Sequence, residues 1–384
     1  MKNSCPGCLS NNFGNIIYKR KGCPVLNNVV YESSNDGRSC LTADIRLVQC
    51  EKCGLVYNID FDNSIIEYNQ CYDNSRNHSE IYSDYIDSLV SCYATYLSHE
   101  STVLEIGCGN DGHFLKKLSD ITGCHGVGYD NAYQGILNYN NKVVFHKQYF
   151  NSDNINNKYD LIILRHVLEH IIEPNLFLKN QICESALLKD GGFVFIEIPD
   201  FNWIIVKGSF FDITYEHCNY FTQNSIFALL QSCNLKITNF RKVFGNQYLA
   251  IDAQQNSKQS IFEKTDLLPN VEDKPFEIFE NSKQNLIECI LKAENVCIWG
   301  ASGKGVILLS DLPLEIVEKI SYVIDINPNK QGKFLPLSAK KIYPPDILKN
   351  HKGKLLVIVM NEVYKEEISV MLENMEVGAF LITP

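Results

Sequence analysis

The sequence predicts an α/β protein in three parts: a small cysteine-containing module, a larger unit with a mostly parallel sheet, and a second, smaller α/β unit. Two pairs of closely spaced cysteines indicate the first part. Apolar segments that alternate with helical patterns indicate the other two. The polar stretch AQQNSKQS, at residues 253–260, separates the two alternating regions. We therefore expect domains at residues 1–65, 66–255 and 256–384.

The composition limits the class of protein. With 384 residues, 45% of them hydrophobic and 21% charged, the chain resembles an ordinary globular protein of two or three domains. No apolar run approaches the length of a membrane span or follows a basic start, so we expect a cytoplasmic protein without a membrane partner. A formal net charge of −10 and the lack of a dense Lys/Arg block argue against a nucleic-acid partner. Monomer and homodimer both stay open.

Four of the fifteen cysteines stand apart from the rest, and they lie in the segments CPGC (Cys5, Cys8) and CEKC (Cys50, Cys53). Two CxxC turns in one small module match a four-cysteine zinc site. Four thiolates complete the tetrahedral coordination of a zinc ion, so the ion is expected to have a structural role. The alternatives are unliganded thiols or a redox pair, and a second CxxC argues against both. The tyrosine-rich residues 65–97 look helical and link this module to the next unit, either as a lid or as a plain amphipathic helix.

Each α/β unit is predicted from strands that run into turns and helices. In the central unit these segments are TVLEIGCGNDGHFLKKL, CHGVGYD, YDLIILRHVLEHI and GGFVFIEIPD. In the last unit a helix precedes NVCIWGASGKG, and ISYVIDINPNKQGKFLP and KLLVIVMNEVYKEEI follow. Such alternation implies a mostly parallel sheet that is covered on both faces.

The segment EIGCGNDG carries a glycine turn between a strand and a helix, at Gly107, Gly109 and Gly112. This turn alone fits any dinucleotide fold, including one that binds NAD. Glu105 lies where it can meet the amino group of S-adenosylmethionine. Asp130 follows at the end of the second strand, about twenty residues later, where its oxygens can accept ribose hydroxyls. These acids, with the VLEH segment that is typical of class I methyltransferases, favour S-adenosylmethionine as cofactor.

Further candidates for the cofactor site are weaker. In KQYF, either Phe150 or Tyr149 lies where such enzymes place groups on the adenine, although a core aromatic fits equally well. Arg165, at the end of the third strand, is a further candidate for contact with the cofactor.

The order of these parts resembles that of the sugar-nucleotide C-methyltransferases. The segments GASGKGVILLS and VIDINPNKQGKFLP look like the family's C-terminal signatures, and CEKCGLVY looks like its second zinc knuckle. The resemblance covers nearly the whole chain. It implies a class I methyltransferase core of Rossmann-like fold, preceded by a four-cysteine zinc module and followed by a second Rossmann-like domain. It also implies a nucleotide-linked keto-deoxysugar as substrate, bound between the last two domains.

The resemblance also assigns roles to the segment FFDITYEHCNYFT, residues 210–222. His217 corresponds to the family's catalytic base, Glu216 to its neighbour and His170 to a further active-site histidine. Carbon methylation beside a keto group first needs a proton removed, and an imidazole titrates in the right range. Glu216 would orient that imidazole or hold a sugar hydroxyl. Tyr215 is a further catalytic candidate and Asn219 a candidate for substrate binding.

The alternatives at these positions are structural, because His217 can be a loop histidine and His170 can cap or pack. The chain also departs from the family, with Thr214 where a tyrosine is common and Met360 where a tryptophan is common before Asn361. These departures leave another sugar, or oxygen as the methyl acceptor, open.

The GASGKG turn could present backbone amides and Lys304 to a phosphate, or it could only pack. Lys330 could meet a diphosphate or be solvated, and Asn361 is a further candidate for substrate binding. Two competing classes remain for the whole chain: an RNA methyltransferase, which the acidic charge disfavours, and a protein that binds S-adenosylmethionine without catalysis.

Overall fold

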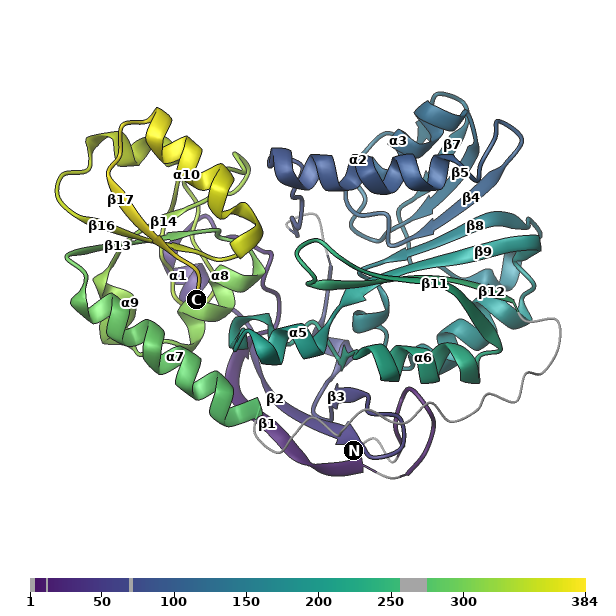
Figure 1. Ribbon diagram of the computed structural model, residues 1–384, viewed down its shortest axis with the longest axis horizontal. Helices are drawn as coiled ribbons and strands as arrows, with labels where there is room; N and C mark the ends of the chain where they lie inside the picture. The colour runs from purple at the N-terminus through teal and green to yellow at the C-terminus, as the bar shows by residue number, and fades with distance from the viewer. Residues whose placement is uncertain (1–3, 12, 69–71, 256–274) are drawn as a thin grey trace.

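The computed structural model describes residues 4–11, 13–68, 72–255 and 275–384. Two α/β lobes lie side by side, and a small β module from the N-terminus lies beneath them (Figure 1). The predicted boundary after residue 255, with residues 256–260 of the polar stretch, lies outside the described residues, as do residues 69–71 of the predicted linking helix. The fold class is the one that the alternation of strands and helices predicted.

The N-terminal module is an antiparallel sheet with the strand order β1-β2-β3-β10. Its last strand, β10 (Asn219–Tyr220), comes from the central unit and pairs with β3 through Asn219 opposite Tyr57 and Tyr220 opposite Val56. The module's own elements are β1 (Phe13–Pro24), α1 (Ser34–Arg38), β2 (Thr42–Cys50), β3 (Val56–Asn58) and η1 (Asn63–Ile65).

The central sheet has the strand order β11-β12-β9-β8-β4-β5-β7-β6. Strand β4 pairs in parallel with both β5 and β8, whereas β12 is antiparallel to β9. The central unit consists of α2 (Glu80–Ala94), β4 (Thr102–Ile106), α3 (His113–Thr122), β5 (His125–Tyr129), β6 (Asn138–Tyr139), β7 (Val143–His146), η2 (Ser152–Asn154), β8 (Tyr159–Arg165), η3 (Leu168–His170), α4 (Pro174–Leu176), η4 (Phe177–Glu184), β9 (Leu188–Pro199), α5 (Phe201–Val206), η5 (Phe210–Asp212), β10, α6 (Gln223–Ser232), β11 (Leu235–Val243) and β12 (Tyr248–Gln255).

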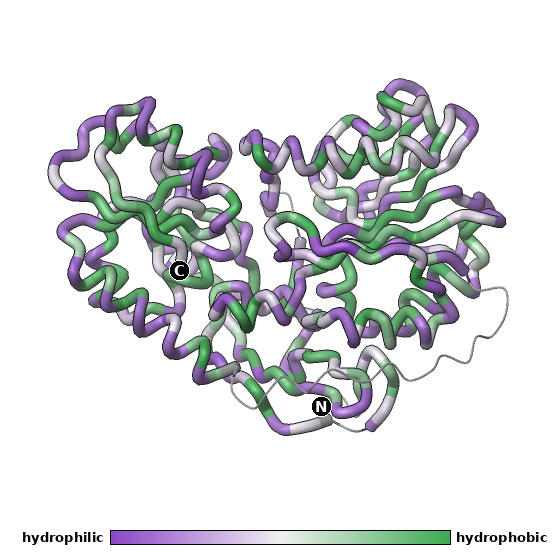
Figure 2. Tube along the Cα trace, in the orientation of Figure 1, coloured by the Kyte–Doolittle hydropathy of each residue, from purple (hydrophilic) through white to green (hydrophobic). Residues whose placement is uncertain are grey.

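Helices cover both faces of this sheet, with α2 and α3 over one face and α6 over the other (Figure 1). The strand interiors are accordingly apolar throughout: β8 buries Leu161, Ile162, Ile163 and Leu164 completely. The hydropathy colouring shows this continuous apolar centre in both lobes (Figure 2). A sheet buried on both faces requires such uninterrupted runs, which is why the sequence revealed these strands.

The C-terminal lobe is a parallel sheet with the order β15-β14-β13-β16-β17. Its elements are α7 (Pro275–Lys292), β13 (Asn295–Trp299), α8 (Gly303–Asp311), α9 (Leu314–Lys319), β14 (Ile320–Ile324), β15 (Ile342–Tyr343), η6 (Pro345–Asn350), β16 (Leu355–Val359), η7 (Glu362–Tyr364), α10 (Lys365–Asn374) and β17 (Ala379–Ile382).

The two lobes use the same device after their second strand. Asp130 accepts the backbone N–H groups of Gly109 and Ala132 at 2.9 and 2.8 Å. Asp325 accepts those of Ala301 and Asn327 at the same two distances. Each acid therefore fixes the turn that follows the first strand of its lobe, which supports a Rossmann-like reading of both units.

One of the apolar clusters is shared by all three parts of the chain. The cluster that contains Tyr18 and Ile45 of the module also contains Phe210 of the central unit and Val306 of the C-terminal lobe. Backbone contacts add to it, because Tyr31 pairs with Phe334 across the module and the last lobe. The module is therefore a common support for both lobes.

Two expectations about helices were wrong in detail. The predicted helix over residues 65–97 begins only at Glu80, where the Ser79 hydroxyl caps it by accepting the N–H of Tyr82. The helix expected to start within VLEH is a single turn, η3 (Leu168–His170). Pro174 follows and disfavours a helical conformation at Glu173, so the next helix starts afresh at Pro174.

Gly305 offers a test of the packing in the GASGKG turn. A Cβ atom there would collide with the backbone carbonyl oxygen of Gly300, which cannot move away without distorting β13. We expect Gly305→Ala to destabilise the protein by about 2 kcal/mol, the usual cost of such overpacking. Gly378→Ala is the matched control, because a Cβ at that position meets no atom within 4 Å. Thermal unfolding that is the same for both variants would contradict the described turn.

Candidate active site

A first cavity, of about 160 Å³, lies where β4, β5 and β8 end. Gly107 and Gly109 line it with positive φ values of 74° each, a conformation that favours glycine. A Cβ on Gly107 would lie 2.5 Å from Val167 Cγ2, so the turn has no room for a side chain. Gly112 does not line the cavity but begins α3, where a Cβ would strike the Phe145 ring.

Glu105 is the acid buried beneath this cavity. Its side chain is only 2% exposed, and its Oε2 has no hydrogen-bond partner among the described residues. Burial raises the pKa of Glu105 to about 8. An orphaned carboxylate of this kind suits a cationic amino group, so the residues present fit the amino-acid end of S-adenosylmethionine.

Asp130 also lines the first cavity, and burial raises its pKa. Each of its oxygens already accepts one backbone N–H, so a ribose could use only the remaining lone pairs. Arg165 lines the cavity too, but its guanidinium donates to Glu197 at 2.9 Å and is committed to that buried ion pair. Its expected contact with a cofactor stays a prediction.

The aromatic residues expected near the adenine lie outside the residues that line this cavity. Phe150 packs edge-on against Tyr129, with ring centroids 5.2 Å apart, as part of a core cluster. Tyr149 is 64% exposed. These contacts favour the alternative interpretation of Phe150 as a core aromatic, and its contact with the adenine stays a prediction.

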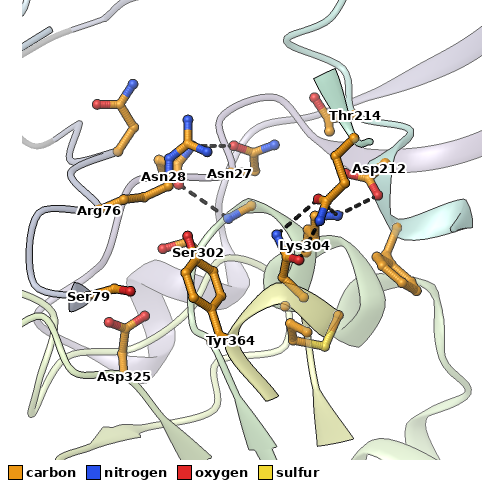
Figure 3. A pocket seen from close by; sticks show the side chains of 18 of the residues that line it. Asn27, Asn28, Arg76, Ser79, Asp212, Thr214, Ser302, Lys304, Asp325 and Tyr364 are labelled. Carbon is orange, nitrogen blue, oxygen red and sulfur yellow. Dashed lines mark hydrogen bonds and ion pairs between the residues drawn. The ribbon is translucent and has the colours of Figure 1, made fainter. Parts of the chain in front are cut away.

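A second, larger cavity of about 300 Å³ lies between the two lobes and the module (Figure 3). The module supplies Asn27 and Asn28, the central unit supplies His217, and the C-terminal lobe supplies Ser302 and Asp325. All three parts of the chain are therefore needed to complete its wall.

The two cavities are adjacent. Asn74, Ser75, Arg76 and His166 line both of them. Arg76 is held in place by a hydrogen bond of 2.7 Å to the Tyr248 hydroxyl and by its position 4.7 Å above the Tyr82 ring. These four residues therefore lie between a group bound in one cavity and a group bound in the other.

His217 and His170 both lie on the wall of the larger cavity, as the sequence predicted. Their rings meet edge to face with centroids 4.9 Å apart. His170 Nδ1 lies 2.9 Å from the backbone carbonyl oxygen of Glu216 and 3.1 Å from the Tyr68 hydroxyl. Burial and the neighbouring His170 lower the pKa of His217 to about 3. The His217 imidazole is thus unprotonated at neutral pH and able to accept a proton.

Glu216 does not orient His217 through its carboxylate. One oxygen accepts the backbone N–H of Asn27 at 2.6 Å, and the other accepts the Tyr72 hydroxyl at 2.6 Å. Burial raises the pKa of Glu216, whereas His170 and these two donors oppose the rise. Its side chain therefore ties the loop to the module and to the segment that follows it.

Two other candidates are not among the residues that line the cavity. The Tyr215 hydroxyl accepts the backbone N–H of Asp62 at 2.8 Å, and its ring stacks on Phe61. The Asn219 amide donates to the carbonyl oxygen of Ile171 at 2.6 Å, and its strand pairs with β3. Both residues anchor the loop to its surroundings, and the catalytic role of Tyr215 and the substrate-binding role of Asn219 stay predictions.

Lys304 and Asn361 do line the larger cavity. Lys304 Nζ donates to Asp212 at 2.8 Å, and Asn361 exchanges hydrogen bonds of 2.7 and 3.0 Å with Gln247 (Figure 3). Lys330 is fully buried behind the cavity wall and donates to the Ser302 hydroxyl at 2.6 Å. Direct contact of Lys330 with a ligand is therefore wrong, and it can act only through Ser302.

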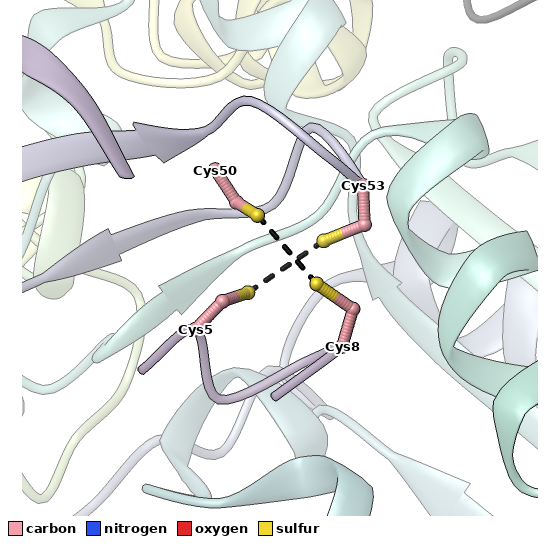
Figure 4. Close-up of side chains that lie close together, drawn as sticks. All are labelled: Cys5, Cys8, Cys50 and Cys53. Atoms are coloured by element: carbon pink, nitrogen blue, oxygen red, sulfur yellow. Dashed lines mark hydrogen bonds between the residues drawn. The ribbon is translucent and has the colours of Figure 1, made fainter. Parts of the chain in front are cut away.

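The four module cysteines come together as the sequence predicted. Their sulfur atoms all lie within 4.8 Å of one another, with Cys5 3.6 Å from Cys53 and Cys8 3.6 Å from Cys50 (Figure 4). These separations are far too long for disulfides. They are close to the ~3.8 Å between sulfurs of a tetrahedral zinc site with Zn–S bonds of about 2.3 Å. The four-cysteine cluster thus fits a zinc ion.

Sequence reasoning missed His166, Arg76, Asn27 and Tyr72. His166 precedes the VLEH segment and carries a positive φ of 55°, a conformation that no sequence pattern reveals. Asn27 and Tyr72 belong to the module and to the link after it, and they reach the site only through the fold. The glycine turn could be predicted because its residues are close together in the sequence. The contacts of these other residues join segments that are far apart in the sequence.

Comparisons with known proteins agree with the fold. Residues 78–239 match a family model described as a methyltransferase domain, and residues 253–384 match one described as a C-methyltransferase C-terminal domain. The comparison with curated proteins found no significant match. Over the described residues, no helix combines the length and apolar character that crossing a membrane would need.

The solved structures that resemble this chain include three proteins, each of which is similar to less than half of it. They are 1,6-didemethyltoxoflavin-N1-methyltransferase of Burkholderia thailandensis (14% identity, 46% of this chain and 81% of that chain, TM-score 0.35), the PH0226 protein of Pyrococcus horikoshii (16%, 48% and 97%, 0.36) and human N-acetylserotonin methyltransferase (19%, 46% and 53%, 0.36). These likenesses are too distant to bear on the substrate. The domain matches and the predicted α/β core together define a methyltransferase that uses S-adenosylmethionine, with a C-methyltransferase C-terminal domain.

Gly107→Arg tests the location of the cofactor. The new side chain would start against Val167 and fill the turn, so we expect binding of S-adenosylmethionine to fall below detection in calorimetry. Gly378→Arg, in open space, is the control and should bind normally. Unchanged affinity of the Gly107 variant, in a protein that still folds, would move the cofactor elsewhere.

Proposed function

We propose that the protein methylates a nucleotide-linked keto-deoxysugar, at carbon, with His217 as the general base. The observation that carries this proposal is the position of His217 on the wall of the larger cavity, which shares four lining residues with the cofactor cavity. A C-methyltransferase C-terminal domain closes the other side of that cavity, which supports a carbon acceptor.

Residues of the first cavity would hold the cofactor, with Glu105 at its amino group and Asp130 near its ribose. When bound, S-adenosylmethionine supplies an electrophilic methyl group. The protein's own part is to align the acceptor, exclude water and remove a proton. His217 takes that proton from the carbon beside the keto group, and the electron pair stays on the substrate. Its low pKa keeps the imidazole unprotonated before this step.

The nucleotide end of the substrate is proposed to lie at the start of α8. Ser302 is the N-cap residue there, yet its side chain makes no capping bond and instead accepts from Lys330. A hydroxyl that accepts from an ammonium group has its own proton free to donate. Ser302 therefore offers a donor to the cavity at the N-terminus of α8, which suits the diphosphate of a nucleotide, although the Gly303 amide there already donates to Asn28 Oδ1 at 3.2 Å. Lys330 acts behind Ser302, and Asn361 and Lys304 lie nearby for the sugar.

Thr214 favours a second acceptor as an alternative. It lines the cavity with a buried hydroxyl that has no partner in the described parts of the chain. This hydroxyl stands where the resembling family commonly has tyrosine, so the bound sugar or its orientation can differ. Methylation of a sugar oxygen, or of a nitrogen, with the same histidine as base is the second candidate.

We propose a zinc ion as the structural centre of the module at residues 1–65, with the methyltransferase unit at 66–255 and the Rossmann-like domain at 256–384. The acidic net charge supports a small-molecule substrate in place of nucleic acid. A cytoplasmic monomer or homodimer without a membrane partner remains the expectation from the sequence.

We expect a variant that loses its zinc ion also to lose order in the loop that carries His217. We expect one zinc per chain by elemental analysis and less than half of that in Cys50→Ser. Because β3 pairs with β10, loss of the metal should also speed amide hydrogen exchange over residues 214–222. Cys92→Ser, at an exposed position, is the control and should retain both properties. Wild-type protein free of zinc would contradict the four-thiolate site.

His217→Asn tests the base. With nucleotide-linked keto-deoxysugars and S-adenosylmethionine, we expect kcat to fall by about 10²–10⁴-fold, the usual share of a general base. His99→Asn, at an exposed position, should be unaffected. Solvent deuterium should enter the reacting carbon in the wild type only. Because a base must be unprotonated and the pKa of His217 is lowered, kcat/KM should stay level down to about pH 5. Turnover without deuterium entry would favour an oxygen acceptor, and activity of His217→Asn equal to wild type would refute the role.

A further inference from the structure

Beneath His217 lies a buried carboxylate that the proposed reaction has not yet used. Glu169 is 2% exposed, and neither of its oxygens makes a hydrogen bond of regular geometry in the described structure. One of its oxygens, a ring nitrogen of His170 and a ring nitrogen of His217 lie within 4.8 Å of one another. An ionised carboxylate in such a place requires positive charge nearby.

The nearest positive charge is available from His166. Its Nδ1 lies 3.3 Å from Glu169 Oε1, and its Nε2 lies 3.0 Å from Glu197 Oε1. A carboxylate can only accept hydrogen bonds, and a neutral imidazole can donate from only one of its two nitrogens. Two carboxylate oxygens thus lie within 3.3 Å of the two ring nitrogens of one imidazole, and their negative charge favours its cationic form. The geometry therefore favours a His166 that carries its positive charge in the resting protein.

Other charged or titratable groups also surround this cluster. Glu197 is also balanced by the Arg165 guanidinium at 2.9 Å, so it does not depend on His166 alone. Glu216 is bonded to Asn27 and Tyr72. The remaining groups that face the cluster are Tyr68, Arg76, Tyr85 and Tyr248. Within the described residues Glu169 forms no ion pair with a lysine or an arginine, so the imidazoles supply its charge balance.

We propose that Glu169, paired with the imidazolium of His166, is the charge partner of His217 and stabilises the second imidazolium that forms when His217 takes the substrate's proton. This inference rests on the proposed function of His217. In that step a carbon–hydrogen bond breaks, a bond from hydrogen to a His217 ring nitrogen forms, and the electron pair remains on the substrate. Glu169 lies in the wall of the larger cavity but is only 2% exposed, and it acts through His217 as a positioning residue.

The electrostatics of the resting site agree with this arrangement. Burial alone would raise the pKa of Glu169, but the contact with His166, helped by the other neighbouring histidines, outweighs it and holds that pKa below its ordinary value. The same carboxylate acts to raise the pKa of His217, against burial and His170. Glu169 therefore takes the place that the sequence had assigned to Glu216 as the partner of the base.

The first test measures the protonation state of His166 in the absence of substrate. Long-range ¹H–¹⁵N spectra of histidine rings, assigned with a His166→Asn variant, should show both His166 nitrogens protonated at neutral pH. In Glu169→Gln, which removes one acceptor and its charge, we expect His166 to move toward the neutral form. Glu169→Asp should retain the doubly protonated form. Neutral His166 in the wild type, or no change in Glu169→Gln, would overturn the proposal whether or not the proposed function is right.

The second test reads catalysis. We expect Glu169→Gln to lower kcat by at least about tenfold with little change in affinity for S-adenosylmethionine, and Glu169→Asp to recover part of the loss. Glu173→Gln, four residues further and exposed, is the matched control and should behave as wild type. Wild-type kcat in a folded Glu169→Gln would overturn the proposal. A second metal ion per chain that depends on Glu169 would do so too, because it would make these side chains ligands.

Discussion

The pairing of β10 with β3 is the constraint on which the rest of the site depends. Two residues beyond His217, the chain leaves the central unit and becomes the last strand of the module's sheet. The Asn58 amide donates to the Cys218 carbonyl oxygen at 3.0 Å and extends this contact to the residue next to the histidine. The four-cysteine cluster adjoins the same strands, because β2 ends at Cys50 and β3 begins three residues after Cys53. A module that touches no cofactor thus determines where the base stands.

Glu216 reinforces the same junction from within. Its buried carboxylate is satisfied by one donor from the module, Asn27, and by one from the link that follows it, Tyr72. An unsatisfied buried carboxylate costs several kcal/mol, so both donors must be in place for the loop to close. The larger cavity is therefore shaped by polar contacts between segments that are distant in sequence, and its opening and closing would have to break them.

Local patterns predicted the fold well and the site in part. The strands of both lobes and the glycine turn at Gly107 follow from periodicity and spacing, which act over a few residues. The four cysteines could be grouped because their chemistry leaves few alternatives. The anchoring contacts of Tyr215 and Asn219 could not be predicted, because a loop sequence gives no sign of which side chain faces the cavity. The sequence did not reveal His166 and Glu169, because their importance depends on a group of charged side chains that only the fold brings together. This group consists of Arg165, His166, Glu169 and Glu197.

The long reach of these contacts also determines the order in which the protein can be built. The amide of Asn27 and the carboxylate of Glu216 are 189 residues apart in sequence, so the module leaves the ribosome long before its last strand is made. Until then β3 presents an unpaired edge, which is prone to bind other chains. The base consequently reaches its final position only after most of the central unit has been synthesised, and maturation of the site is a late event in the life of the nascent chain.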